Sequence, residues 1–339
     1  MREFSLIAEL HRRYGKGHSS IIRGIGDDTA VVRAASGSWS LLTTDLLVEG
    51  IHFDRHTASF SEIGYRAAVA NLSDIAAMGG TPQYLLIALA VPPSGTRAQV
   101  HQLYRGMMAA CRPHGVRLIG GDTSASKSGW FLSLALIGTV APRRALLRKG
   151  AQAGDLLYVT GTLGDASIGL TLLNEAASRR YRRGKRGTLS RTHKQFLIQR
   201  HLHPTARVKE GRWLSAGRLA TAAIDLSDGL SGDLHHLCDE SRVGVEVNLA
   251  AIPLSPACRA YAQGRRLNPT AVALAGGEDY ELLFTVAPRL QARLEREAKR
   301  LGFRITNIGT IRPARLGMHA RSSKRGSRPL PVTSYEHFI

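Results

Sequence analysis

Acidic residues next to glycines recur along this chain, and they are the residues whose types could do chemistry. The first example is Asp27-Asp28, which follows Gly24 and Gly26 and precedes the apolar run Ala30-Val31-Val32. Neighbouring carboxylates repel one another, and a bound hard cation relieves that repulsion through oxygen ligands and opposite charge. A polar turn is the alternative interpretation, because Asp and Gly are common turn residues.

The whole series of such residues favours the metal over the turn. The series comprises Asp27, Asp28, Asp45, Asp74, Asp122, Asp225 and Asp228. Six of the seven are predicted at strand ends or in the adjoining turns, and Asp74 is predicted on a helix. Carboxylates without neighbouring thiolates are hard-cation ligands, which indicates several Mg²⁺ ions. Magnesium in a strongly basic chain points to phosphoryl transfer.

Composition narrows the classes of partner and compartment. Lys and Arg number 46 against 26 acidic residues in 339, a net charge of +20, which favours nucleotides, phosphorylated metabolites, nucleic acid or a membrane surface. Cys111, Cys238 and Cys258 form no CxxC pair, which argues against zinc and against a disulfide framework. No signal peptide and no run of membrane-spanning length is apparent. We therefore expect a soluble, cytoplasmic protein.

The usual nucleotide-binding motifs do not occur in the sequence. The segment 15–20 lacks the spacing of GxxxxGK[ST], no HRD catalytic loop is present, and Gly24-x-Gly26 lacks the third glycine of a dinucleotide fingerprint. A phosphotransferase with this sequence must therefore use another design.

Strands alternate with helices in both halves, which predicts an α/β (α+β) architecture. Helices are predicted over 5–14, 62–78, 100–111, 164–177 and 230–238, with Ser61 as the N-cap of the second. Strands are predicted over 39–44, 83–91, 116–123, 131–140, 154–161, 221–226 and 282–286. We place a domain boundary near residue 145, dividing the chain into 1–145 and 146–339.

Two basic segments have no predicted role in the chemistry. Residues 178–194 are dense in Arg and Lys and poor in apolar side chains, so we predict a mobile surface loop or frayed helix end. Residues 321–328 are predicted to form a basic, serine-rich loop.

Six motifs, in order along nearly the whole chain, resemble those of the thiamine-monophosphate kinase family. They are Ile25–Asp28, Thr43–Asp45, Asn71–Gly79, Gly120–Thr123, Ile224–Gly229 and Gly276–Leu282. The resemblance implies the two-domain fold shared with aminoimidazole ribonucleotide synthetase and selenophosphate synthetase. It also implies ATP-dependent phosphorylation of thiamine monophosphate to thiamine diphosphate, and a homodimer built through the N-terminal domains. The N-terminal domain would bind ATP and Mg²⁺, and the C-terminal domain would complete the active site.

The resemblance also implies roles for particular residues. The magnesium ligands would be Asp28, Thr43, Thr44, Asp45, Asp74, Asp122, Asp225 and Asp228. The contacts to ATP would come from Tyr104, Gly121, Asp122, Arg148 and Ser227. His52, Glu278 and Tyr335 would contact thiamine monophosphate. No protein nucleophile is expected, because the substrate's own phosphate oxygen attacks ATP directly.

Two other functions are compatible with parts of the sequence. Another ATP-dependent synthetase of the same superfamily is the nearest alternative, although the Gly276–Leu282 motif and the absence of a reactive N-terminal cysteine argue against selenophosphate synthesis. A nucleic-acid-binding protein would explain the charge, but the basic residues are scattered and no reader motif is recognisable.

Overall fold

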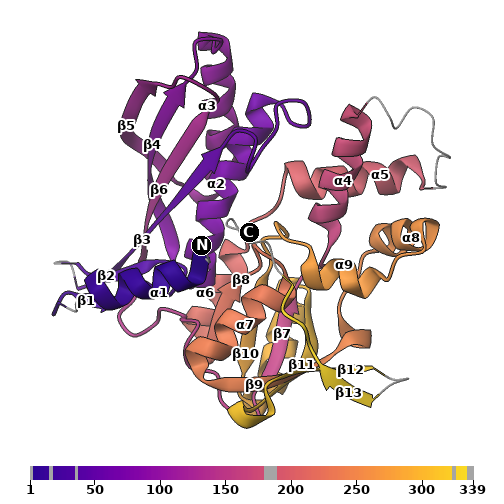
Figure 1. The fold of residues 1–339 in the computed structure, drawn as a ribbon. Helices are drawn as coiled ribbons and strands as arrows, with labels where there is room; N and C mark the ends of the chain where they lie inside the picture. Colours follow the sequence, from indigo (N-terminus) through magenta and orange to yellow (C-terminus); the bar gives the residue numbers. More distant parts are fainter. Residues whose placement is uncertain (1–2, 15–17, 35–36, 179–188, 323–325, 334–339) are drawn as a thin grey trace.

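The computed structural model describes residues 3–14, 18–34, 37–178, 189–322 and 326–333. Within these ranges the chain forms two sheets, one from each half, with α2 (Phe60–Ala77) running between them (Figure 1). This helix contacts β3 (Trp39–Val48) and β6 (Phe131–Val140) of the first sheet and β8 (Ala222–Asp225) of the second. One helix therefore connects the acidic motifs of both halves.

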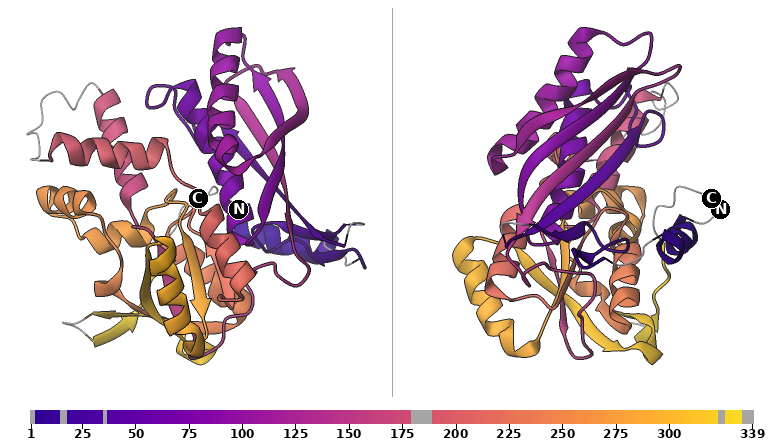
Figure 2. Two further views of the ribbon diagram at one scale, coloured as in Figure 1. Left: turned by 180° about the vertical axis from the view of Figure 1, so that it is seen from behind. Right: turned by 90° about the vertical axis from the view of Figure 1, so that its left-hand side faces the viewer.

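The first sheet has six strands among the described residues. Its strands lie in the order β1 (Ile21–Arg23), β2 (Ala30–Arg33), β3, β6, β4 (Thr81–Val91) and β5 (Arg117–Ala125). Only the β4–β5 pair is parallel, and β5, the last strand in this order, forms an edge of the sheet. Alternate side chains of β6, such as Leu132, Leu134 and Leu136, are buried on the face covered by α2 and α3 (Arg97–Cys111). The right-hand view of Figure 2 looks onto the opposite face, where no helix of the described ranges covers the strands.

The helix α2 is fixed at its start and along its length by local chemistry. Ser59 is its N-cap: the Ser59 hydroxyl accepts from the Glu62 backbone N–H, and the Glu62 carboxylate accepts from the Ser59 N–H. The predicted cap at Ser61 is therefore wrong by two residues. A Cβ on Gly64 would lie 2.1 Å from the Leu103 carbonyl oxygen, so glycine allows α2 and α3 to pack backbone to backbone.

The second sheet has seven strands among the described residues. Its order is β13 (Gly326–Pro329), β12 (Met318–Ser322), β9 (Val243–Asn248), β11 (Ile305–Pro313), β7 (Leu156–Thr160), β10 (Leu282–Val286) and β8. Around it lie α4 (Asp165–Ala177), α5 (Arg191–Leu202), α6 (Val208–Gly217), α7 (Leu230–Ser241), α8 (Pro256–Arg265), α9 (Pro269–Ala275) and α10 (Gln291–Leu301). The remaining elements are α1 (Glu3–Tyr14) and the short 3₁₀ turns η1 (Arg112–His114), η3 (Leu249–Ala251), η4 (Pro288–Leu290) and η5 (Ala314–Leu316).

Two acidic residues lie inside strands rather than at strand ends. β3 continues past Asp45 to Val48 because it pairs with β6 along its whole length. β5 likewise runs through Asp122 to Ala125, since Gly120 and Gly121 are extended and pair with β4. The predicted strand ends at these two positions are wrong.

The two basic segments are partly described and partly outside the described residues. Residues 179–188 lie outside, but Ser190 caps α5, so 191–194 begin a helix rather than a loop. In the segment 321–328, residues 323–325 lie outside, and the rest belongs to the paired strands β12 and β13 rather than to a loop. No helix in the described part of the chain is long and apolar enough to cross a membrane.

Candidate active site

A cavity of about 660 Å³ lies between α2 and β3 on one side and two loops of the second half on the other. Its lining includes eight of the predicted site residues: Thr44, Asp45, His52, Asp74, Asp225, Ser227, Asp228 and Glu278. Leu46, Leu47, Ile51, Ala70, Leu170 and Tyr280 supply much of its apolar surface. The sequence motifs from both halves therefore meet around one cavity.

Three carboxylates converge beside this cavity, and two of them, Asp74 and Asp225, line it. Asp28 comes from the turn before β2, Asp74 from α2 and Asp225 from the end of β8. One carboxylate oxygen of each lies within 4.8 Å of those of the other two. Ionised carboxylates this close repel strongly, so the cluster requires protons or a cation.

The electrostatics of the cluster favour a cation at neutral pH. Burial, with the nearby Asp28 carboxylate, raises the pKa of Asp225 to about 7. Burial raises the pKa of Asp45 to about 6, and burial together with Asp45, Asp225 and Asp28 raises the pKa of Asp74 well above its usual value. Oδ2 of Asp28 and Oδ2 of Asp45 are buried without a hydrogen-bond partner in the described structure. Unpartnered carboxylate oxygens fit a hard divalent ion such as Mg²⁺.

Neighbouring groups orient these carboxylates. The Ser73 hydroxyl donates to Oδ2 of Asp225 over 2.6 Å, and the Thr43 hydroxyl donates to Oδ2 of Asp74. Arg148 donates from Nη2 and Nε to Oδ1 of Asp28, over 2.5 and 3.1 Å. Burial opposes the charge of Arg148, but the adjacent Asp28 carboxylate raises the pKa of its guanidinium above the usual value. The guanidinium of Arg148 therefore lies, positively charged, beside the carboxylate cluster.

Glu278 and His52 line the cavity together with apolar groups. The Glu278 carboxylate forms an ion pair with Arg66 of α2, and the Glu278 backbone N–H donates to the Ser227 carbonyl over 2.7 Å. His52 accepts a hydrogen bond at Nδ1 from the Val48 N–H over 3.0 Å. A carboxylate beside apolar walls suits a ligand that carries both a ring and a positive charge.

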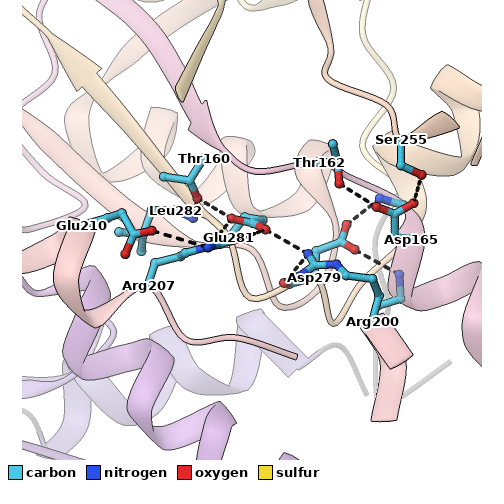
Figure 3. A network of polar contacts seen from close by, with 12 residues as sticks. Thr160, Thr162, Asp165, Arg200, Arg207, Glu210, Ser255, Asp279, Glu281 and Leu282 are labelled. Atoms are coloured by element: carbon cyan, nitrogen blue, oxygen red, sulfur yellow. Dashed lines mark hydrogen bonds and ion pairs between the residues drawn. The ribbon is translucent and has the colours of Figure 1, made fainter. Parts of the chain in front are cut away.

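A network of polar contacts surrounds Asp279 and Glu281, which directly follow Glu278 in the sequence (Figure 3). Glu281 accepts from Arg207 over 2.5 Å, from Arg200 over 2.9 Å and from the Thr160 hydroxyl over 2.6 Å. Burial opposes ionisation of Glu281, but Arg207 and Arg200 hold its pKa below the usual value. Asp279 accepts from the backbone N–H groups of Gly164 and Ala166 at the start of α4.

Arg66, Arg200 and Arg207 were not among the residues predicted from the sequence. Arg66, Ala70 and Asp74 are spaced four residues apart, and this spacing places all three on one face of α2. This spacing could therefore have predicted that Arg66 lies on the same face as Asp74. The two arginines of the network carried no local signal, because they pair with Glu281 across 81 and 74 residues.

Seven predicted residues do not line the cavity in the described part of the chain. Asp28, Thr43 and Arg148 belong to the carboxylate cluster or contact it, but the described structure places none of the other four there. Tyr104 lies half-buried against the first core, and Gly121 and Asp122 lie on the exposed edge strand β5. Asp122 pairs with Ala88 of β4, Ala88 pairs with Ser133 of β6, and Ser133 pairs with Leu46 of β3. Asp122 therefore lies three strand spacings, roughly 14 Å, from Leu46, which lines the cavity. Tyr335 lies outside the described residues. The roles of all the predicted site residues, these four included, stay predictions.

Comparisons with known proteins agree with this geometry. Residues 26–140 match the family described as AIR synthase related protein, N-terminal domain, and residues 152–319 match the corresponding C-terminal domain. The fold, with a site formed by both halves of the chain, therefore defines an AIR synthase-related protein. This confirms the predicted two-domain α/β fold class.

More specific relatives narrow the family. A thiamine-monophosphate kinase from Bacillus subtilis (strain 168) is 34% identical over 340 residues, covering 100% of both chains. The structure of AaThiL complexed with AMPPCP and TMP superposes with a TM-score of 0.83 at 32% identity, covering 99% of this chain and 97% of that one. A thiamine-monophosphate kinase structure from Stenotrophomonas maltophilia K279a gives a TM-score of 0.75 at 36% identity, covering 94% and 96%. The chain belongs to the thiamine-monophosphate kinase family.

Proposed function

We propose that this chain transfers the γ-phosphoryl group of ATP to thiamine monophosphate, giving thiamine diphosphate and ADP. The names of its relatives support this activity, as does the AaThiL complex with AMPPCP, an ATP analogue, and TMP. The observation that carries the proposal is the cavity itself, with an acidic cluster at one end and Glu278 at the other. Arg66, the partner of Glu278, and Asp74 are eight residues apart on α2, about 12 Å along the helix axis. In this proposal, thiamine monophosphate extends between these two groups.

The reaction needs no nucleophile from the protein. An oxygen of the substrate phosphate attacks the γ-phosphorus, a new P–O bond forms, and the bond to the bridging oxygen of ADP breaks. Both reactants are anions, so their mutual repulsion contributes to the barrier. Arg148, held beside Asp28, places positive charge near the reacting phosphates and helps to orient them.

The acidic residues hold Mg²⁺ in this proposal. Asp28, Asp74 and Asp225 form the core of the site, and Thr43, Thr44, Asp45 and Asp228 lie around them. Bound Mg²⁺ would neutralise charge between the two phosphates. The family resemblance alone supports a role for Asp122 as a further ligand. It alone also supports contacts of Tyr104 and Gly121 with ATP.

The opposite end of the cavity recognises the thiamine moiety. Thiamine is aromatic and cationic, and the Glu278 carboxylate provides the opposite charge within an apolar surround. His52 adds a polar contact on the same wall, and Tyr335 is proposed to complete the site. This arrangement favours thiamine monophosphate over free thiamine, because the Mg²⁺ ions held by the acidic cluster bind the phosphate at the other end of the cavity.

We also propose that the protein is a cytoplasmic homodimer built through the N-terminal sheet. Among the described residues, no helix covers one face of that sheet, and apolar side chains of its strands are exposed, with Leu46 55% and Ile119 53% accessible. Leu42 and Tyr84 are also exposed on β3 and β4, and both are in register with Ile137 of β6. An apolar face beside an unpaired edge strand is typical of a contact between protein chains. The three free, buried thiols suit a reducing compartment.

Substrate preference tests the proposed activity. Purified protein is supplied with ATP, Mg²⁺ and either thiamine monophosphate or free thiamine, and the products are separated chromatographically. Thiamine monophosphate is expected to be converted to thiamine diphosphate, and free thiamine is expected to react far more slowly. Equal turnover of free thiamine would overturn the assignment of the phosphate as the acceptor.

A further inference from the structure

Arg66 is a buried cation in the cavity wall to which the family motifs assign no role. It lies in the second turn of α2, and only 5% of the residue is accessible to solvent. Its Nη2 forms an ion pair with Oε1 of Glu278, across 212 residues of sequence. A buried arginine is costly unless it is paired, so Glu278 is part of what keeps Arg66 in this position.

Glu278 itself is held in an unusual conformation. Its φ of +67° lies in the left-handed region, which costs energy for a residue with a side chain. The preceding Gly277 packs so closely on the Ser227 loop that a Cβ there would lie 2.5 Å from the Ser227 carbonyl oxygen. The backbone is therefore fixed, while the Glu278 side chain, 32% accessible, faces the cavity and needs a separate restraint.

Arg66 supplies that restraint from one side, and His201 lies on the other. Nδ1 of His201 is 3.4 Å from Oε2 of Glu278, and the ring is fully buried. Burial, with the nearby Arg66 charge, lowers the pKa of His201 to about 4, so the ring is neutral at pH 7. Arg66 then provides the positive charge that faces the Glu278 carboxylate.

We infer that Arg66 is a positioning residue for substrate recognition, which holds the Glu278 carboxylate toward the thiamine end of the cavity and sets the affinity for thiamine monophosphate. This inference rests on the proposed function. Arg66 and Asp74 are separated by two turns of α2, so Arg66 acts at the end of the cavity away from the transferred phosphoryl group. Its loss therefore weakens substrate binding while leaving the phosphoryl-transfer step nearly intact.

A competing interpretation places Arg66 in direct contact with the substrate. Nε of Arg66 is buried without a hydrogen-bond partner in the described structure, so a donor is available. The two interpretations differ in how Arg66 and Glu278 depend on each other. A residue that acts only through Glu278 loses its effect when Glu278 is changed, whereas an independent contact does not.

A double-mutant cycle in steady-state kinetics decides between them, using Arg66→Met, Glu278→Gln and the double variant. Arg66→Met is expected to raise KM for thiamine monophosphate about tenfold, with kcat within about threefold and KM for ATP within about twofold of wild type. Arg66→Lys, which keeps the charge, is expected to recover part of that loss. In the Glu278→Gln background, Arg66→Met is expected to add less than about twofold. Arg265→Met, which removes a comparable ion pair with Glu175 outside the cavity, is the matched control and should leave all three constants unchanged.

Three outcomes would overturn the inference: an unchanged KM for thiamine monophosphate in Arg66→Met, parallel losses in kcat and in KM for ATP, or multiplicative effects in the double variant. Thermal unfolding of each variant separates a binding defect from a folding defect. If Arg66→Met does not fold, the same cycle with Arg66→Lys gives the decision. A wild-type protein that forms no thiamine diphosphate refutes the proposed function, whereas an active wild type with an unaffected Arg66→Met refutes only this inference.

Discussion

Replacing Asp225 with asparagine should stabilise the metal-free protein while damaging the enzyme. Asp225 is buried, and its pKa is raised from 3.8 to about 7 by burial and by the Asp28 carboxylate. The folded protein therefore holds a proton that the unfolded chain has released, so stability falls as pH rises from 3.8 to about 7. That shift corresponds to a penalty of about 4 kcal/mol at pH values above 7. Asparagine keeps an oxygen acceptor for the Ser73 hydroxyl but carries no charge.

Thermal unfolding in the presence of a chelator measures the effect. At about pH 8, Asp225→Asn should unfold roughly 5–10 °C above wild type, and the difference should shrink by more than half by about pH 5. Millimolar Mg²⁺ should raise the unfolding temperature of wild type more than that of the variant, because the variant lacks one ligand charge. Turnover should fall at least about tenfold and recover in part at higher Mg²⁺.

The control for this experiment is Asp239→Asn, which changes an exposed carboxylate on α7 outside the cluster. It should shift neither the unfolding temperature nor the turnover. Equal stability of wild type and Asp225→Asn in chelator at about pH 8 would refute the electrostatic argument. Full activity of Asp225→Asn at limiting Mg²⁺ would refute the proposed metal site.

Three further substitutions test other parts of the structure. Glu281→Gln removes the buried carboxylate that pairs with Arg200 and Arg207 and leaves Arg207 only its pair with Glu210, so denaturant titration should show a loss of about 3 kcal/mol in unfolding free energy; an unchanged midpoint would contradict the role of the network. Ile119→Asp places a charge on the exposed edge strand and should convert the proposed dimer to a monomer in sedimentation experiments, whereas a persisting dimer would place the interface elsewhere. Asp122→Asn should lower turnover at least about tenfold without changing stability in chelator, because Asp122 is exposed; full activity would remove it from the proposed ligands.

Much of the fold was predictable because local signals agree with the tertiary structure. The predicted helix 164–177 closely matches α4 (Asp165–Ala177), whose apolar side chains face the second core. The predicted strand over 131–140 is β6 (Phe131–Val140), where buried side chains alternate along the strand. Asp28, Asp74 and Asp225 were predicted to be metal ligands from residue type and motif, and the structure brings their carboxylates together.

The rest depended on contacts that a local sequence pattern does not contain. α5 was not predicted because it is largely polar and buries only Leu197, His201 and Leu202. Its helical start becomes clear only from the Ser190 cap and from packing against α4. The pairing of Arg66 with Glu278 arises when α2 meets a loop from the other half, so only the three-dimensional structure reveals it.

The most direct test of the central claim follows the γ-phosphoryl group. Purified protein is incubated with γ-labelled ATP, Mg²⁺ and thiamine monophosphate, and the label is traced in the nucleotide, thiamine and protein fractions. We expect the label to appear in thiamine diphosphate, in step with ADP formation, with none retained on the protein. Label trapped on the protein during turnover, or ADP released without labelled thiamine diphosphate, would contradict direct transfer between the two bound anions.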